Sequence, residues 1–400
     1  MKYAFTKINI ESPFPTTQCG HSCQVEKLFT YHDHLYARVA GLKDEENWII
    51  HLSLDLLAFD QQHRDMLEEE LQKYYSCPDL HVITSTTHTH YANSVRDPEY
   101  VAYLYELLVN EIKNMSYREV NDVTTSYQRL HTTAIGKSRI SGYETDNEYL
   151  ALIRFYEGEH NFLTFVYYNC HPTILQANVP FFSAEYPGYV LKKLEDEYDD
   201  CDFSFLQGAA GDISSRFVRN GQNYEDVMEL GNNLLIDITS LYEKKVNRVP
   251  LKLVYRAFPV EFEHEFTPID LSKIRQNLSE REKETIRLGQ IERAKLEKKN
   301  NQIFGQPNEK INIVALALGS VELIFFPNEI FSHYLNYLDL DKKLLVSYSN
   351  GYGPYVLPLD FEYITYEMFT DTLSVETKKR IIAILKEIGN VNFRGFDTPG

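Results

Sequence analysis

A pair of histidines, His88-Thr89-His90, stands at the end of the apolar run 81–87. Residues two apart in an extended chain project from the same face, so both imidazoles are predicted to line one pocket. They would serve there as two metal ligands, or as one ligand beside one substrate-facing group. Hydroxyl side chains crowd the same stretch, and hydroxyls orient metal ligands from outside the coordination sphere. A histidine pair alone more often consists of ordinary polar residues in a loop, so the assignment of a metal site depends on other residues.

Two further candidate ligands end two other apolar runs. His171 follows the run 162–170, and Pro172 after it favours an extended backbone that ends the strand. Glu329 follows the run 321–326. An acidic residue is also favoured in the first turn of a helix, which is an alternative explanation for this glutamate. Histidines with one carboxylate are the usual ligands of a catalytic zinc ion.

Two loops carry further polar candidates. The segment 207–214 contains four consecutive small residues, which permit close approach of backbone to a ligand, followed by Asp212 and Ser214. A tight turn capped by Asp or Ser would give the same pattern. The segment 349–355 combines glycines and a proline with phenols, which bind metals or donate hydrogen bonds to an oxyanion.

The elements that must position these residues alternate between apolar strands and amphipathic helices. Strands are predicted at 48–59, 81–87, 150–155, 162–170, 204–206, 251–262, 311–318, 321–326 and 344–349, and helices at 63–75, 99–115, 187–198, 224–242, 329–338 and 375–388. This alternation predicts an α/β fold with a mixed β-sheet core flanked by helices, in a single domain over 1–400. The charged stretch 271–301 is predicted to be a solvent-facing helical excursion, with a partner-binding helix as the alternative.

The charge and hydropathy of the chain exclude several classes of partner. A formal net charge of −18 argues against nucleic acid and anionic membrane surfaces, because both require a basic patch. No apolar stretch is long enough to cross a bilayer, so no membrane insertion is expected. The N-terminal residues lack a signal-peptide pattern, which predicts a cytoplasmic protein. The oligomeric state is not readable from the sequence.

Taken in chain order, the short motifs resemble the neutral/alkaline ceramidase family in its N-terminal catalytic domain. The motifs are Leu-Tyr-Ala-Arg at 35–38, Ser-Leu-Asp at 53–55, Thr-His-Thr-His at 87–90, Cys-His-Pro-Thr at 170–173, Glu-Tyr-Pro-Gly-Tyr at 185–189, the loop 207–214, Pro-Asn-Glu at 327–329 and Asn-Gly-Tyr-Gly-Pro-Tyr-Val at 350–356. The resemblance extends from about residue 8 to about residue 370. It implies a short form without the C-terminal immunoglobulin-like domain of the family.

The resemblance implies a zinc amidohydrolase with the catalytic-domain fold of that family. The zinc ligands carried over by position are His88, His171, Glu329 and Tyr355. Zn²⁺ is therefore the expected cofactor.

The resemblance also implies roles for five catalytic residues. His90 falls at a substrate-facing position, and Ser214 at the catalytic serine beside the metal. Arg139 lies near the active-site arginine of the family, and Tyr366 resembles its oxyanion-side tyrosine. Asp212 is expected to support the loop that carries the serine.

Four departures from the family pattern bear on the substrate. Tyr91-Ala92-Asn93 follows the histidine pair where the family has a small, glycine-containing turn. Glu185 stands where aspartate is usual, Asn328 replaces glycine, and Ser215-Arg216 follows the serine where proline or asparagine is typical. These changes leave the metal set intact and weaken the case for a lipid substrate. We therefore predict a zinc-dependent hydrolase that cleaves an N-acyl bond of a small-molecule or lipid-like substrate by metal-activated water. The open alternatives are a zinc esterase or deacetylase of a small polar or sugar-linked substrate, and a non-catalytic ligand-binding relative.

Overall fold

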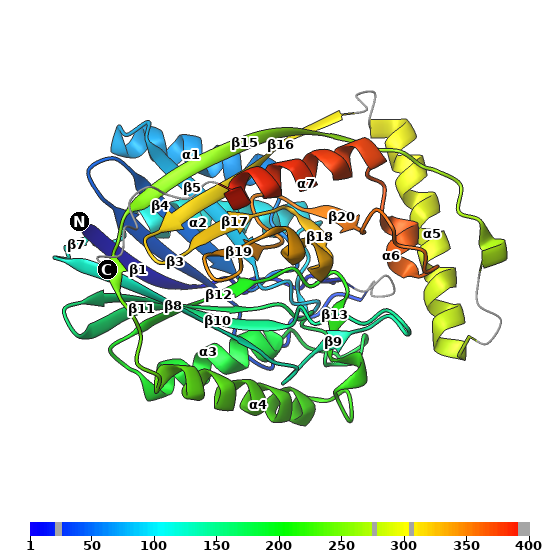
Figure 1. Ribbon diagram of the computed structural model, residues 1–400, viewed down its shortest axis with the longest axis horizontal. Helices are drawn as coiled ribbons and strands as arrows, with labels where there is room; N and C mark the ends of the chain where they lie inside the picture. Colours follow the sequence, from blue (N-terminus) through cyan, green and yellow to red (C-terminus); the bar gives the residue numbers. More distant parts are fainter. Residues whose placement is uncertain (21–25, 274–277, 304–307, 391–400) are drawn as a thin grey trace.

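Three β-sheets meet on one hydrophobic core, and helices cover their outer faces (Figure 1). The computed structural model describes residues 1–20, 26–273, 278–303 and 308–390. The central core takes side chains from all three sheets, for example Ile49, Phe165 and Val314. Strands in this position are covered on both sides, which explains why they appear in the sequence as continuous apolar runs.

The first sheet has the strand order β5-β4-β3-β1-β7. Its strands are β1 (Lys2–Asn9), β3 (Tyr36–Lys43), β4 (Trp48–Leu54), β5 (Leu80–Thr86) and β7 (Arg118–Glu119). β4 and β5 run parallel, whereas the other pairs are antiparallel. Helices α1 (Gln61–Tyr75) and α2 (Pro98–Lys113) bury their apolar faces against this sheet. The α1 crossover fixes β5, and with it the His88-Thr89-His90 loop, beside β4.

The second sheet has the order β12-β11-β10-β8-β14. Its strands are β8 (Val123–His131), β10 (Tyr149–Glu157), β11 (His160–Tyr168), β12 (Asp202–Gln207) and β14 (Val249–Pro250). β11 and β12 are parallel and are joined through α3 (Glu185–Glu197). α3 and α4 (Tyr224–Tyr242) cover the outer face, and an Asn223–Asp226 capping box starts α4.

The third sheet has the order β15-β16-β17-β19. Its strands are β15 (Leu253–Glu263), β16 (Asn308–Leu318), β17 (Glu322–Phe325) and β19 (Lys343–Val346). The predicted hairpin joins β16 to β17, and Gly319 takes the left-handed conformation that its turn requires (φ 75°). Helix α7 (Val375–Asn390) packs against β15.

Several short elements and the long helix α5 make up the remainder of the described chain. They are β2 (Gln18–Cys19) with β6 (Ala92–Asn93), β9 (Lys137–Ser138) with β13 (Ile213–Ser214), β18 (Asn328–Ile330) with β20 (Gly353–Val356), the 3₁₀ turns η1 (Ser215–Phe217), η2 (Leu271–Lys273) and η3 (Ser332–Tyr337), and the helices α5 (Glu280–Ile303) and α6 (Tyr366–Thr370). α5 stands at the right of Figure 1 and packs against α6.

The predicted α/β class, with mixed sheets and flanking helices, is confirmed. α4 has the bounds predicted for it, 224–242, and the strand predicted at 48–59 is real but ends at Leu54. The charged stretch 271–301 contains a helix from Glu280, although residues 274–277 of it lie outside the described chain. The single domain stays a prediction.

The helix predicted at 329–338 is wrong. Residues 328–330 form strand β18, and only a 3₁₀ turn follows it. β18 pairs in parallel with β20, a partner that lies far along the chain. This long-range pairing overrides the local preference for an acidic residue in a first helical turn. The sequence prediction also missed β1, β3 and β8.

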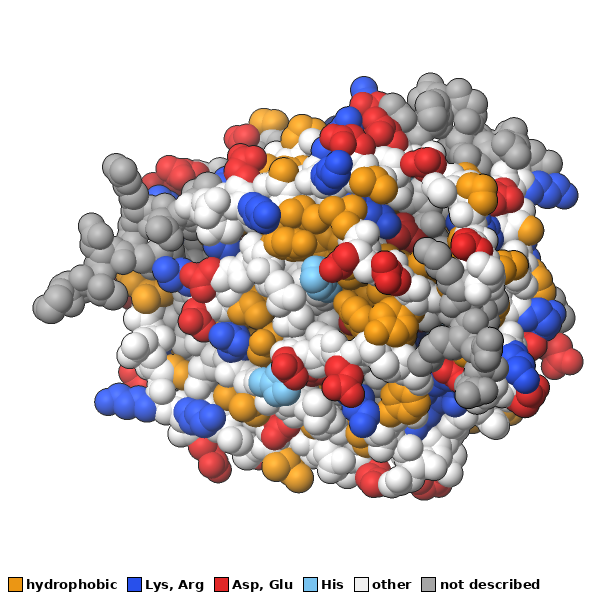
Figure 2. Space-filling view, turned by 45° about the vertical axis from the view of Figure 1, so that its right-hand side comes forward, with side chains coloured by type: hydrophobic (Ala, Val, Ile, Leu, Met, Phe, Trp, Pro, Cys, Tyr) orange, Lys and Arg blue, Asp and Glu red, His pale blue; other side chains and the backbone are white. Residues whose placement is uncertain are grey.

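Among the described residues, no helix combines the length and the apolar character needed to cross a membrane. Acidic and basic side chains are interspersed over the face shown in Figure 2, with small hydrophobic groups between them. The cytoplasmic location stays a prediction.

Candidate metal centre

His88 and His90 lie just beyond the end of β5, against the loop that follows β4. His88 has φ 63°, so the extended geometry predicted for the pair is wrong. Its backbone N–H donates to Leu56 O at 3.0 Å, and its ring Nδ1 lies 2.8 Å from Leu57 O. The ring also stacks on Tyr348 at 3.8 Å. A left-handed backbone costs about 1–2 kcal/mol for a residue with a Cβ, and these contacts stabilise it.

His171 lies beyond the end of β11 and is held by the loop that follows β12. Its backbone N–H donates to Ile213 O at 3.0 Å, and its ring Nδ1 lies 2.6 Å from Ala210 O. In the same loop, a Cβ on Gly211 would lie 2.7 Å from the carbonyl oxygen of Glu329. The small residues of this loop therefore let it pack against strand β18, and the close approach to a ligand stays a prediction.

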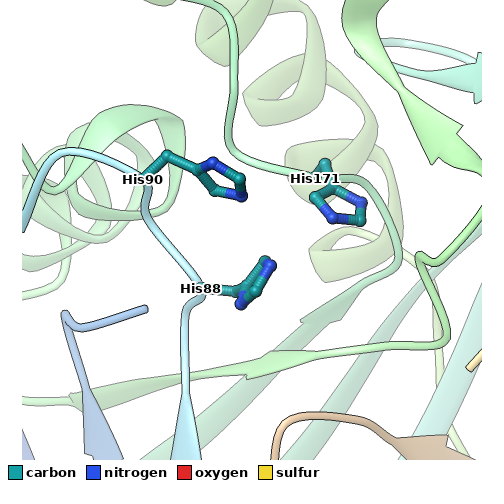
Figure 3. Close-up of side chains that lie close together, drawn as sticks. All are labelled: His88, His90 and His171. Atoms are coloured by element: carbon teal, nitrogen blue, oxygen red, sulfur yellow. The ribbon is translucent and has the colours of Figure 1, made fainter. Parts of the chain in front are cut away.

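The three histidine rings converge on one point from two different sheets (Figure 3). Ring centroids are 5.0 Å apart for His88 and His90, 5.0 Å for His88 and His171, and 5.8 Å for His90 and His171. One ring nitrogen from each lies within 4.8 Å of the other two. His88 and His90 follow a strand of the first sheet, and His171 follows a strand of the second. The three rings nevertheless form one cluster with metal-ligand spacing.

Glu329 extends from β18 into the same cluster. Its Oε2 lies 3.0 Å from His171 Nε2 and 3.5 Å from His88 Nε2. Its Oε1 accepts a hydrogen bond from the Tyr352 hydroxyl at 2.6 Å. Tyr355, on β20, pairs with Glu329 in the two-stranded sheet. The β18–β20 pairing therefore brings two predicted ligands to one place.

The tautomers of His88 and His171 follow from their partners. A carbonyl oxygen can only accept, so Nδ1 of each ring carries the hydrogen, and Nε2 presents a lone pair to Glu329. Burial, with the Arg139 cation, lowers the pKa of His171 to about 4. Burial opposes ionisation of Glu329, but positive charge facing it from the side of His88 and His171 outweighs burial and holds its pKa well below the ordinary range. With Nδ1 carrying the hydrogen, the Nε2 atoms of both rings and the Glu329 carboxylate face one another, an arrangement that a cation between them would stabilise.

Zinc fits this donor set. Two ligands bound to one zinc at about 2.1 Å lie roughly 3.4 Å apart in a tetrahedral site. The observed separations of 3.0 and 3.5 Å agree with that spacing. The backbone carbonyls that hold Nδ1 of each ring supply the outer contacts that metal-binding histidines usually have.

Arg139 ties the predicted tyrosine ligand to the rest of the site. Its Nη2 donates to the Tyr355 hydroxyl at 2.8 Å and to Gly211 O at 2.9 Å, and its Nε lies 2.8 Å from Glu367 Oε1. Burial lowers the pKa of Arg139, but Tyr355 and Glu367 outweigh it and raise that pKa above its usual value. The ring of Tyr366 stands edge-on to Tyr355 at 6.1 Å. The four residues form one contact group beside the histidines.

Asp212 and Ser214 occupy different surroundings. The Asp212 carboxylate accepts from the Ser332 backbone N–H at 2.6 Å and from its hydroxyl at 2.8 Å, so it holds η3 against the loop. Burial raises the pKa of Asp212 to about 6. Ser214 forms a backbone bridge with His171, and its hydroxyl accepts from the Arg216 N–H at 3.4 Å. The Asp212 carboxylate is thus committed to Ser332, whereas Ser214 is one backbone bridge from His171.

Sequence analysis missed three residues of this site. Tyr352 holds Glu329, Tyr348 stacks on His88, and Glu367 pairs with Arg139. The signal was present, because the segment 348–355 concentrates phenols among glycines, but periodicity cannot say which phenol points inward. Tyr352 is 40% exposed, so it connects the buried carboxylate to the surface.

No protein-family model matches the sequence, and no curated protein matches it. Solved structures do match. A neutral ceramidase from Pseudomonas aeruginosa superposes with a TM-score of 0.73 and 13% sequence identity, over 97% of this chain and 74% of that chain. The chain has the neutral ceramidase fold. A ceramidase structure in complex with C2 gives a TM-score of 0.69 with the same identity and coverage. The predicted resemblance to the ceramidase family is confirmed for the fold, and the chemistry must be argued from the side chains.

Proposed function

We propose that this protein is a zinc-dependent hydrolase that cleaves the amide bond of an N-acyl compound. The observation that carries the proposal is the convergence of His88 Nε2 and His171 Nε2 on Glu329 Oε2, at 3.5 and 3.0 Å. The fold shared with neutral ceramidase supports an amide as the bond that is broken. We propose a small-molecule or lipid-like compound as the substrate.

His88, His171 and Glu329 are the proposed zinc ligands, with Tyr355 as the fourth. A bound zinc ion would lower the pKa of a water molecule to about 7, and the ion would also polarise the acyl carbonyl. Tyr352 fixes the carboxylate of Glu329 through its 2.6 Å hydrogen bond. The Nδ1 contacts fix both imidazoles, so the donor set is organised before the ion binds.

The remaining residues have proposed roles in hydrolysis. Water oxygen adds to the acyl carbon, the C–N bond breaks, and the departing amine takes a proton. His90 and Tyr366 are the proposed donors to the oxyanion that forms on the acyl oxygen. Ser214, bridged to His171, is the proposed relay of the proton from water to the amine. Arg139 holds the Tyr355 hydroxyl in position.

A substrate panel tests this function. The purified protein is incubated with N-acyl amines, N-acyl amino acids and matched O-acyl esters, and the released amine or alcohol is measured. We expect amide hydrolysis that is abolished by a zinc chelator and restored by added zinc. Hydrolysis of the esters alone would replace the amidase with the esterase or deacetylase alternative. Zinc-loaded protein that cleaves nothing and binds the compounds would favour a non-catalytic relative.

A further inference from the structure

A cavity of about 350 Å³ is lined by the loop that precedes β10 and by the turn η3. Its volume lies at the lower end of the range of sites that bind small molecules. None of its lining residues is a proposed zinc ligand or catalytic residue, so the cavity is separate from the metal centre. The lining residues are Glu144, Thr145, Asp146 and Asn147 on the loop, and His333 and Asn336 on the turn.

Hydrogen bonds hold the two walls of the cavity together. The Thr145 hydroxyl lies 3.2 Å from the Ser332 hydroxyl, which in turn donates to the Asp212 carboxylate at 2.8 Å. The side-chain amide of Asn169 donates to the carbonyl oxygen of Asn147 at 2.7 Å. The loop and the turn are therefore fixed to one another and to the strand ends behind them, and the cavity is organised before any ligand binds.

Asn147 has a buried polar side chain that lacks a partner. The residue is only 9% exposed and lines the cavity. Its backbone oxygen accepts from Asn169, but its side-chain amide makes no hydrogen bond with any residue that the structure describes. Buried amides are normally hydrogen-bonded, because an unmade bond leaves the cost of desolvation uncompensated. A ligand in the cavity would supply the missing partner.

Two carboxylates give the cavity its charge. Glu144 and Asp146 are exposed, and neither forms an ion pair or a hydrogen bond within the described ranges of the chain. No lysine or arginine lines the cavity to balance them. His333 and Asn336, one 3₁₀ turn apart on the same side of η3, add further hydrogen-bonding atoms. Like charges in one concave site concentrate a negative potential, which favours a cation as the ligand.

The spacing of these groups favours an organic cation over a metal ion. Among the described residues, the side chains whose ligand atoms converge within 4.8 Å are the three histidines of the metal centre, and not those of the cavity. A metal ion requires several ligand atoms at about 2.0–2.6 Å from one point. An ammonium group on a flexible carbon chain can instead reach carboxylates that lie further apart, and it needs the larger volume that the cavity provides.

We propose that this cavity binds a small aliphatic amine as its ammonium ion. The carboxylates of Glu144 and Asp146 accept from the ammonium group, and the side-chain oxygen of Asn147 accepts from the same or a second polar group of the ligand. Two sources supply such a cation, namely the amine that the proposed hydrolysis would release and a free diamine or polyamine.

Isothermal titration calorimetry on the purified protein tests the site. The probes are ethanolamine, putrescine and spermidine at low ionic strength, with 1,4-butanediol as the uncharged counterpart of putrescine. At least one amine should bind about 10-fold or more tightly than the diol. Preference for ethanolamine would assign the site to a released monoamine, and preference for putrescine or spermidine would assign it to a diamine or polyamine.

Variants locate the binding. Glu144→Gln, Asp146→Asn and Asn147→Ala should each weaken amine binding about 10-fold. Because the Asn147 amide bonds nothing in the described chain, Asn147→Ala should unfold at the same urea concentration as the wild type, which separates lost binding from lost folding. Glu69→Gln removes an exposed carboxylate of α1 that has no ion pair within the described residues, and this matched control should bind like the wild type.

Three results would overturn the inference. The first is that no amine binds more tightly than the diol. The second is that the three cavity variants bind the amine as tightly as Glu69→Gln does, which would show attraction to the acidic surface alone. The third is binding of calcium or of a neutral sugar in place of the amines. Because binding is measured without turnover, none of these results bears on the proposed hydrolase function.

Discussion

Two buried histidine environments in this molecule differ in what faces the imidazole ring. His51, in the middle of β4, has Nε2 2.8 Å from the Ser85 hydroxyl and aromatic rings of Phe165 and Phe325 beside it. At the metal centre, the lone pairs of two rings face a carboxylate. Burial lowers the pKa of His51 to about 3, below the value of about 4 for His171. A perturbed pKa therefore does not distinguish the two environments, whereas convergence on a carboxylate does, and the proposed metal site rests on that convergence.

Removing one ring from each environment gives the largest contrast. His88→Ala should lower kcat/KM at least about 1,000-fold, because it deletes a proposed zinc ligand. His51→Leu should keep the rate constant within a few-fold while lowering the unfolding free energy by about 1–3 kcal/mol, since the Ser85 hydroxyl loses its 2.8 Å contact and keeps only Leu52 O at 3.4 Å. Steady-state kinetics and denaturant unfolding measure both. Equal losses of activity in the two variants would remove the distinction.

The histidine cluster offers two possible three-residue ligand sets, and a second contrast separates them. Glu329→Gln should weaken zinc binding more than about 100-fold, because the carboxylate supplies the anionic donor. His90→Ala should bind zinc nearly as well as the wild type and lose about 100-fold in kcat, as expected for an oxyanion donor. Zinc titration against a competing chelator provides the affinities. The reverse pattern would assign the metal to His88, His90 and His171.

The hydroxyl that holds Glu329 should have a smaller effect. Tyr352→Phe removes the 2.6 Å hydrogen bond to Oε1 and should lower zinc affinity about 10-fold to 100-fold. Tyr189→Phe is the matched control, since that hydroxyl bonds Asn232 on the surface. If both phenylalanine variants bind zinc like the wild type, Tyr352 does not position the ligand.

The smallest effect on metal binding is expected for the loop that follows His171, where the contrast appears instead as a pH dependence of stability. Glu185 is buried and accepts from the backbone N–H groups of Ile174, Leu175 and Tyr186, and burial raises its pKa from 4.5 to about 7. The folded state therefore keeps this proton longer than the unfolded chain does, and stability must fall as pH rises from about 4.5 to about 7.

Glu185→Gln removes this titration. The unfolding free energy of the wild type relative to the variant should fall by on the order of 3 kcal/mol across that window and stay level above it. Urea unfolding of both proteins at a series of pH values measures the difference. A difference that is constant, or that rises with pH, would show that Glu185 ionises normally.

The sequence predicted those parts of the site that depend on local pattern. Apolar runs located β5 and β11, and Pro172 indicated that His171 would stand at a strand end. What the pattern could not supply comes from long-range contacts. Glu329 is on a strand because β20 pairs with it, and His88 has a left-handed backbone because the loop after β4 holds it.

The phenols illustrate the same limit. A cluster of tyrosines in 348–355 is visible in the sequence, but only the register of β20 decides that Tyr355 lies opposite Glu329 while Tyr352 reaches its carboxylate. The resemblance to the ceramidase family named Arg139, and the structure places its guanidinium on Tyr355 and Glu367. Tertiary contacts of this kind leave no periodic pattern in the sequence from which they could be predicted.

The metal content of the purified protein tests the central claim most directly. Elemental analysis after zinc loading and exhaustive dialysis should find about one zinc per chain in the wild type and in His51→Leu, and almost none in His88→Ala or His171→Ala. A wild-type protein that retains no zinc, or a His88→Ala variant that retains all of it, would contradict the assignment of these side chains to a metal centre.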